Sequence, residues 1–99
     1  METQRYKIYA DSGHSWLKVD KSELFNLKIA SKITNYSYEE DGYVYLEEDC
    51  DATLFINAKK EHGIEVDGDF IYSDGDSIVR SYQHYKKPCV VLSFGSRGN

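Results

Sequence analysis

The sequence concentrates its carboxylic acids in one short stretch. Seven of the thirteen residues from Glu39 to Asp51 are Asp or Glu, and neither Lys nor Arg occurs among them. Such a negative field attracts a positively charged partner and makes the encounter sensitive to salt. We therefore predict an acidic, Tyr-lined surface that imitates phosphate charge and binds a host protein with a basic surface. The predicted partner-binding residues are Glu39, Glu40, Asp41, Tyr43, Tyr45, Glu47 and Glu48.

The same acids suit two further roles. A charged strand edge keeps a sheet soluble and discourages pairing with strands of other molecules. A cation site is the second role, although calcium loops space their ligands more tightly around a central Gly than this run does. The binding surface requires that the carboxylates point the same way and are not neutralised by the chain's own lysines.

A second set of residues has the chemistry to hold a small ligand. Trp16 and His14 offer rings for stacking, and Arg80 near Tyr82 offers a guanidinium for a phosphate or a carboxylate. We expect these four residues to form a nucleotide-sized pocket if the protein sequesters a nucleotide signal, which is the alternative function.

Simpler structural roles suit these residues as well. Trp16 is then an anchor of the core, and His14 is a residue of a turn. Arg80 pairs in that case with a nearby carboxylate such as Asp74 or Asp76.

Catalysis is a third function that the residues allow. Cys50 with His14 or His84 would supply a nucleophile and a base. The chain contains no phosphate loop, dinucleotide fingerprint or metalloprotease motif. Its histidines lack zinc-finger spacing. We therefore predict a binding protein rather than an enzyme, with no catalytic residues, no cofactor and no metal site.

Length and charge narrow the partners further. Ninety-nine residues predict a single domain over 1–99, and a formal net charge of −5 argues against direct binding to duplex nucleic acid. The apolar runs are far shorter than the roughly 20 residues of a membrane span, and the N-terminus lacks a signal-peptide pattern. We expect a cytoplasmic protein that does not contact membranes. Its nine tyrosines make a homodimer through a Tyr-rich sheet face a candidate assembly.

The first third of the chain predicts a hairpin followed by a helix. Residues 5–10 and 16–19 have strand character, and the turn between them contains Gly13. Asp20 is a predicted N-cap with Glu23 three residues later, as in a capping box, and the helix covers about 21–27. Residues 29–33 add another turn.

The middle third repeats this arrangement. Strands are predicted at 36–40 and 43–47, and Asp41-Gly42 is a strong signal for a tight hairpin turn. A helix follows over about 51–62, capped by Asp49 or Asp51 and ended by Gly63. Units of ββα type are therefore predicted at about 5–30 and 36–62.

The last third predicts extra strands within 64–94. Short strands are expected at 64–66 and 70–72, on either side of a turn at 67–69, and a final strand at 89–94. Residues 77–85 fit helix or loop. The predicted fold is α+β, an antiparallel sheet of hairpins with two short helices packed on one face.

The order of motifs resembles a group of small uncharacterised proteins from bacteria, phages and plasmids. The likeness is carried by Gly13-His14-Ser15-Trp16-Leu17, by Tyr36-Ser37-Tyr38 and by the segment from Tyr45 to Ala52 with the sequence YLEEDCDA. This resemblance implies a short accessory protein of a mobile element. Such a setting suggests inhibition of a host nucleic-acid-handling or defence protein, and it assigns no catalytic role to any residue.

Overall fold

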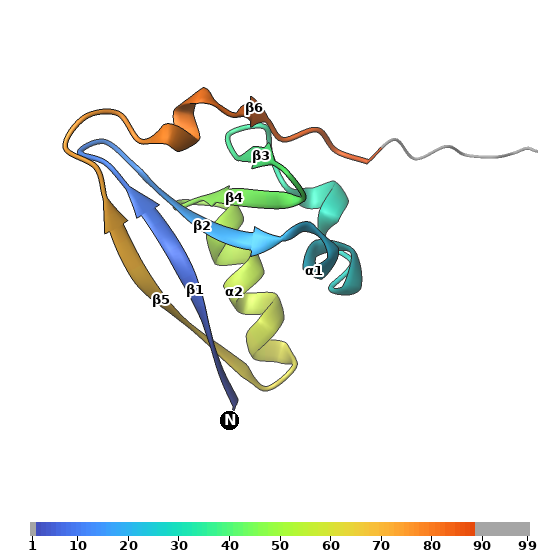
Figure 1. Ribbon diagram of the computed structural model, residues 1–99. Coiled ribbons are helices and arrows are strands. Elements are labelled where there is room, and N and C mark those ends of the chain that lie inside the picture. Colours follow the sequence, from blue (N-terminus) through green and yellow to red (C-terminus); the bar gives the residue numbers. More distant parts are fainter. Residues whose placement is uncertain (1, 89–99) are drawn as a thin grey trace, which may run out of the picture.

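The computed structural model describes residues 2–88 and has the predicted α+β class, with six strands in one sheet (Figure 1). The strand order is β5-β1-β2-β4-β3-β6. The elements are β1 (Glu2–Ala10), β2 (Ser15–Asp20), α1 (Lys21–Asn26), η1 (Ala30–Lys32), β3 (Tyr38–Glu40), β4 (Tyr43–Glu47), α2 (Asp51–Glu61), β5 (Ile64–Tyr72), η2 (Ile78–Ser81) and β6 (Gln83–His84). The element order therefore contains ββα twice. The strand predicted at 89–94 lies outside the described residues.

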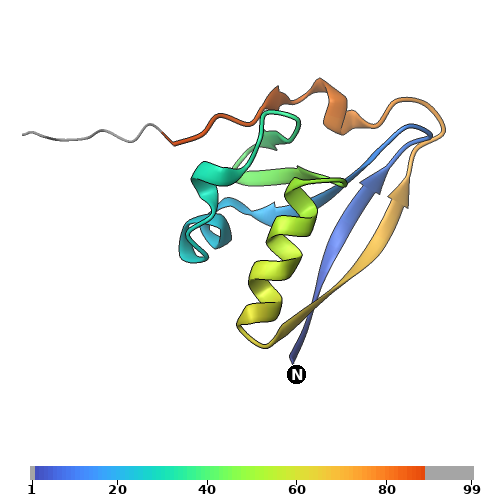
Figure 2. The ribbon, with the colours of Figure 1, turned by 180° about the vertical axis from the view of Figure 1, so that it is seen from behind.

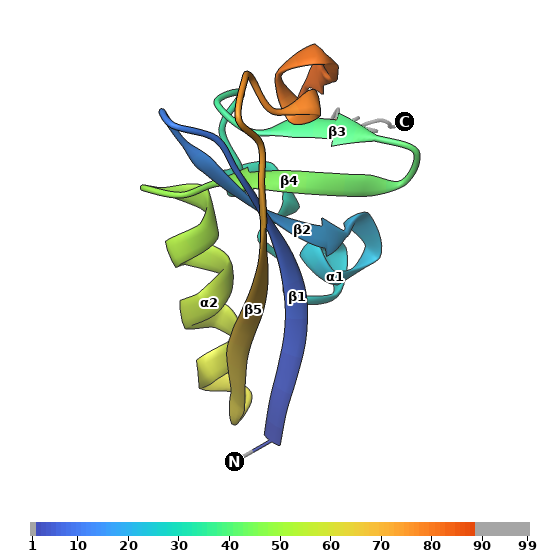
Figure 3. The same cartoon turned by 60° about the vertical axis from the view of Figure 1, so that its left-hand side comes forward.

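The sheet is mixed, which corrects the expectation of a wholly antiparallel one. β5 runs parallel to β1 along its whole length, from Glu2 opposite Ile64 to Ala10 opposite Tyr72. The helix α2 connects β4 to β5, and Figure 3 shows β1 and β5 side by side. The other four strand pairs are antiparallel.

The turn predicted at 67–69 is wrong, because these residues continue β5. Asp67 and Asp69 both hold the guanidinium of Arg5 on β1, so their carboxylates serve a strand pair. Gly68 lies close to Ile8, since a Cβ at this position would be 2.4 Å from Cδ1 of Ile8 and would displace that side chain or the strand. The acid–Gly–acid pattern therefore marks a contact between strands in this chain.

The first helix begins as predicted but is stabilised differently. Asp20 accepts a hydrogen bond from the backbone N–H of Ser22 at 2.9 Å, which confirms the N-cap. Glu23 does not reach back to complete a capping box. Its Oε1 lies 2.6 Å from Nζ of buried Lys59 on α2 and 2.9 Å from the hydroxyl of Tyr6 on β1. This contact joins α1, α2 and β1.

The second hairpin and helix follow the predicted turn chemistry. Asp41 and Gly42 both have positive φ, of 53° and 83°, as a tight primed turn requires. Gly63 has a φ of 76° and follows the end of α2. The predicted N-cap of α2, Asp49 or Asp51, is wrong: Cys50 occupies the N-cap position and makes no side-chain cap bond. Glu47 accepts from the N–H groups of the residues before the helix instead.

The main core lies between the sheet and the helices. Its centre is Phe55 of α2, which contacts the face of the sheet that carries Leu17 and Val44, and α1 adds Leu24. Figure 2 shows α2 lying across this face. None of the described helices is long and apolar enough to cross a membrane.

The opposite face of the sheet, here called the open face, carries a second and smaller cluster. Trp16 and Tyr45 are buried there against Val79 of η2. The sequence of residues 77–85 fits helix or loop, and the structure has a short 3-10 helix and a two-residue strand there.

Candidate functional site

The strand register places aromatic residues in adjacent positions on the open face. Trp16 of β2 lies opposite Tyr9 of β1 and opposite Glu47 of β4. Tyr38 of β3 lies opposite Tyr45 of β4 and opposite His84 of β6. Because side chains alternate along each strand, these residues share one side of the sheet.

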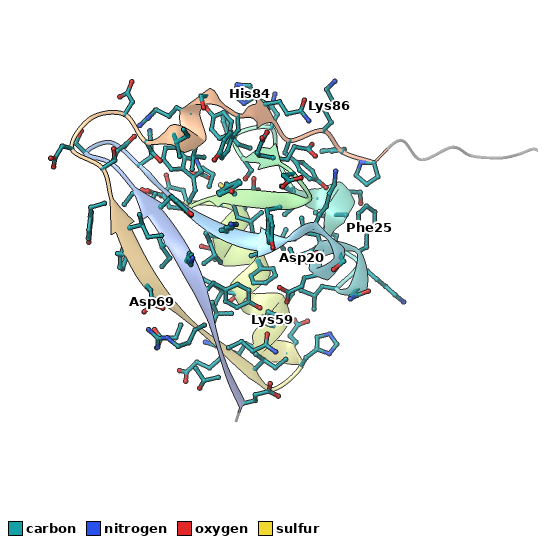
Figure 4. The ribbon with its side chains drawn as sticks, viewed as in Figure 1. Asp20, Phe25, Lys59, Asp69, His84 and Lys86 are labelled. Carbon is teal, nitrogen blue, oxygen red and sulfur yellow. The ribbon has the colours of Figure 1, made fainter. Side chains whose placement is uncertain are left out.

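A cavity of about 430 Å³ opens among these rings, and we call it the aromatic hollow. Its ring residues are His14, Trp16, Tyr36, Tyr38 and His84, and its other lining residues are Glu47, Asp49, Cys50 and Arg80. The size falls within the range of about 300–1,000 Å³ that is usual for ligand pockets. Four segments meet at it: the start of β2, the residues around β3, the junction of β4 and α2, and η2–β6 (His84 is labelled in Figure 4).

The rings of the aromatic hollow support one another. Trp16 and Tyr38 meet edge to face with centroids 6.0 Å apart, and Tyr38 stacks on His84 at 4.6 Å. Trp16 is 2% exposed, whereas Tyr36 is 69% exposed. Trp16 therefore has the predicted role of a core anchor, and it also forms a wall of the hollow. The ring of His84 is oriented by Nδ1, which donates to the carbonyl of Asn35 at 2.8 Å.

Arg80 is held by Asp11, and not by Asp74 or Asp76 as the sequence suggested. Its Nε and Nη2 donate to the two carboxylate oxygens of Asp11 at 2.6 and 3.0 Å. Its Cζ lies 5.1 Å from the centre of the Trp16 ring, within cation–π distance. The guanidinium therefore already has a carboxylate and an aromatic partner within the chain.

Asp11 is also a hub for the turn that carries His14. Its carboxylate accepts from the backbone N–H groups of Gly13, His14 and Ser77 at 2.9–3.0 Å. Hydrogen bonds from Arg80 and then from Ser77 hold the pKa of Asp11 well below its usual range, although burial opposes the shift. The same pair raises the pKa of Arg80. The ion pair is permanent at neutral pH.

Two carboxylates of the aromatic hollow have no cationic partner among residues 2–88. Glu47 accepts from the N–H of Asp49 at 2.9 Å and from that of Cys50 at 3.0 Å, which fixes its orientation. Asp49 is exposed beside it. Neither carboxylate belongs to any of the ion pairs in the described part of the chain.

The predicted acidic surface is divided by the fold. Glu39 faces the helix side, where it pairs with Nζ of Lys21 at 2.7 Å and accepts from the backbone N–H of Lys86 at 2.8 Å. Burial works against ionisation of Glu39, but the hydrogen bonds from Lys21 and Lys86 outweigh it and lower the pKa. Glu40 and Asp41 are exposed at the hairpin turn. The requirement that the chain's own lysines leave these acids free is therefore not met at Glu39.

The remaining residues of that prediction also have neighbours within the chain. Glu48 accepts from the backbone N–H and the hydroxyl of Ser15. Tyr43 is partly exposed and lies under Nζ of Lys18, 4.2 Å from its ring centre. Tyr45 is buried, its ring centroid is 5.1 Å from that of Tyr82, and burial followed by the neighbouring Tyr82 raises its pKa. Of the predicted partner-binding residues, Glu47 alone lines the aromatic hollow.

The residues predicted to bind a small ligand lie closer together than the residues of the predicted acidic surface. His14, Trp16 and Arg80 line one cavity although Arg80 is more than sixty residues away in sequence. Tyr82 packs on Tyr45 beside it and does not line it. Cys50 and both histidines of the catalytic alternative also line the hollow. The described residues contain no cluster of three or more potential metal ligands.

Sequence reasoning missed Tyr36, Tyr38 and Asp49 as lining residues. A signal for Tyr38 was present, because it occupies the same strand face as Tyr45 once the Asp41-Gly42 turn sets the register. Tyr36 and Asp49 lie outside the strands, so alternation could not place them.

Comparison of the chain with family models, with curated proteins and with solved structures gives no match.

Proposed function

We propose that this protein acts by binding a protein with a basic surface through the aromatic hollow and the acids beside it. The carrying observation is that aromatic rings line the hollow together with two carboxylates, Glu47 and Asp49, that have no cationic partner in the described chain. Aromatic faces and carboxylates both attract cations. The formal net charge of −5 adds long-range attraction toward a basic partner.

The biological effect we propose is inhibition. A small acidic protein that covers a basic surface prevents that surface from binding nucleic acid. The resemblance to short phage and plasmid proteins supports a partner among host nucleic-acid-handling or defence proteins. Glu40 and Asp41, exposed at the far end of the β3–β4 hairpin, would extend the negative surface beyond the hollow.

A nucleotide ligand is the second candidate, and the shared cavity of His14, Trp16 and Arg80 favours it. The charges of the same cavity oppose it. The guanidinium of Arg80 is already held by Asp11. The carboxylates of Glu47 and Asp49, which have no cationic partner within residues 2–88, repel phosphate. We therefore place the basic partner first.

The proposed function is tested with a synthetic decapeptide of alternating Arg and Ser, titrated into the full chain at low and high ionic strength. Binding is expected at low salt and is expected to weaken strongly at high salt, because the charges are at the surface. Asp49→Lys reverses a charge at the hollow and should weaken binding about tenfold or more. Glu61→Lys, at the opposite end of α2, makes the same change in net charge and serves as the matched control.

Equal affinities for Asp49→Lys and Glu61→Lys would contradict binding at the hollow. No binding of the peptide to the unaltered chain at low salt would overturn the proposed function itself.

A further inference from the structure

We propose that the aromatic hollow binds the guanidinium group of an arginine side chain on the partner, in preference to the ammonium group of a lysine. This inference rests on the proposed function and names the group that the site would recognise. It follows from the combination of aromatic rings with a carboxylate that is fixed in one orientation, Glu47, and from the way the chain already binds a guanidinium at the same place.

The walls of the aromatic hollow suit a planar cation. A guanidinium stacks on an aromatic face and at the same time donates two parallel hydrogen bonds to a carboxylate, whereas an ammonium acts as a compact point charge. The hollow is lined by the largely exposed ring of Tyr36 and by Tyr38, which stacks on His84, and Glu47 is held in one orientation by two backbone N–H groups. Those two bonds use one acceptor position on each oxygen of Glu47 and leave the others for a ligand.

The chain contains its own example of this recognition. Arg80 donates twice to the carboxylate of Asp11 while its Cζ lies 5.1 Å from the centre of the Trp16 ring. Gly13 makes room for it, since a Cβ there would lie 3.0 Å from Nη2 of Arg80. A guanidinium held between a carboxylate and a ring is thus stable in this environment.

The charge in the aromatic hollow selects a cation over an anion. Among residues 2–88, Arg80 is the only Lys or Arg that lines it, and the carboxylate of Asp11 neutralises this charge. The carboxylates of Glu47 and Asp49 then leave an excess of negative charge facing the cavity. An incoming guanidinium would compensate it, and a phosphate would add to it.

The test uses argininamide, lysinamide and ATP as probes of the full chain, followed by nuclear magnetic resonance. Trp16 is the only tryptophan, so its indole N–H resonance reports on the hollow without ambiguity. Argininamide is expected to shift this resonance and to bind at least about threefold more tightly than lysinamide, as a stacked and bidentate cation should. ATP is expected to leave the resonance unchanged.

Two variants locate the binding. Tyr36→Ala removes an exposed ring of the hollow and should weaken argininamide binding several-fold without unfolding the chain. Tyr72→Ala removes an equally exposed ring at the end of β5, outside the hollow, and should leave the affinity unchanged.

The outcomes separate this inference from the proposed function. If the Arg–Ser peptide binds but argininamide and lysinamide bind equally, or if Tyr36→Ala has no effect, the arginine assignment is wrong and the basic-partner function survives. If ATP shifts the Trp16 resonance, argininamide does not and the Arg–Ser peptide fails to bind at low salt, both are overturned in favour of a nucleotide ligand.

Discussion

Asp11 shows how one carboxylate organises the candidate site. It lies between the end of β1 and the turn before β2, and it binds Arg80 and Ser77 from a segment more than sixty residues later. Its carboxylate accepts from the backbone N–H of His14, which shapes the turn that presents this residue. The same carboxylate places Arg80 over Trp16. The residue lies outside the wall of the hollow and determines the position of two residues within it.

We expect Asp11→Asn to destabilise the fold in a pH-dependent way. The pKa of Asp11 is lowered in the folded chain, so its contribution is fully present above the unfolded value of about 4 and is lost as the pH falls toward the folded value. The difference in free energy of unfolding between wild type and Asp11→Asn should be constant near neutral pH and should narrow below about pH 4. Urea unfolding at several pH values measures it.

Asp74→Asn is the matched control, because this exposed carboxylate is one that the sequence alone associates with Arg80. It should change stability by less than about 0.5 kcal/mol, as is usual for exposed positions. A larger effect of Asp74→Asn than of Asp11→Asn would show that the ion pair is assigned to the wrong acid.

Side-chain chemistry predicted which residues lie together in the site better than proximity in the sequence did. His14, Trp16 and Arg80 were predicted to lie together because their side chains suit one ligand, and one cavity does contain them. The acids of the hairpin were grouped by sequence proximity, which does not fix the direction of a side chain. Glu39 points to the helix side and meets Lys21, a residue that no local pattern connects with it.

At the scale of the elements, the parallel pair β1–β5 is the feature that local patterns could not predict. Hairpins are readable because their turns are local, as at Asp41-Gly42. A parallel pair joins residues about sixty positions apart, and its register depends on contacts such as that between Ile8 and Gly68. The two hairpins and the helices were therefore predicted, whereas β5 was divided at its own Gly.

Gly68→Ala is expected to lower the free energy of unfolding by about 1–3 kcal/mol, the usual cost of overpacking. The added Cβ would lie 2.4 Å from Cδ1 and 2.8 Å from Cγ1 of Ile8, so Ile8 or the strand must move. Gly75→Ala is the control, because a Cβ there meets nothing within 4 Å. Urea unfolding of both variants measures the difference.

A second change in the same pair sharpens the test. Ile8→Val shortens the side chain that the new Cβ would meet, and the double variant should recover part of the stability lost by Gly68→Ala. Equal destabilisation by Gly68→Ala and Gly75→Ala would mean that backbone conformational preference, and not the contact with Ile8, sets the cost.

At the scale of the whole molecule, the sheet separates two clusters of unequal size. The main core contains residues of α1 and α2, Phe55 among them, whereas the buried cluster of the open face contains, among the described residues, Val79 of η2 and no residue of either α-helix. β6 is joined to β3 by two residue pairs, while β1 and β5 share nine. The strand that supplies His84 to the aromatic hollow is therefore joined to the sheet by fewer residue pairs than any other described strand.

The tyrosines are divided between these clusters, which bears on self-association. Tyr45 and Tyr85 are buried, while Tyr36 and Tyr72 are largely exposed on different parts of the surface. The described residues thus do not form one continuous exposed Tyr face. The homodimer expected from the Tyr content stays a prediction without a surface assigned to it.

Because β6 pairs with β3 at only two residue positions, we expect η2–β6 to open independently of the main core. Val79→Ala removes a buried side chain of η2, at a cost of about 2 kcal/mol, and should accelerate hydrogen exchange of the Arg80 and Tyr82 amides roughly thirtyfold. The amides of β2 should keep their rates in this variant. Phe55→Ala, which costs about 3–5 kcal/mol in the main core, should accelerate both groups. Uniform acceleration by Val79→Ala would show one cooperative unit instead. A ligand in the hollow would then stabilise the whole fold rather than η2–β6 alone.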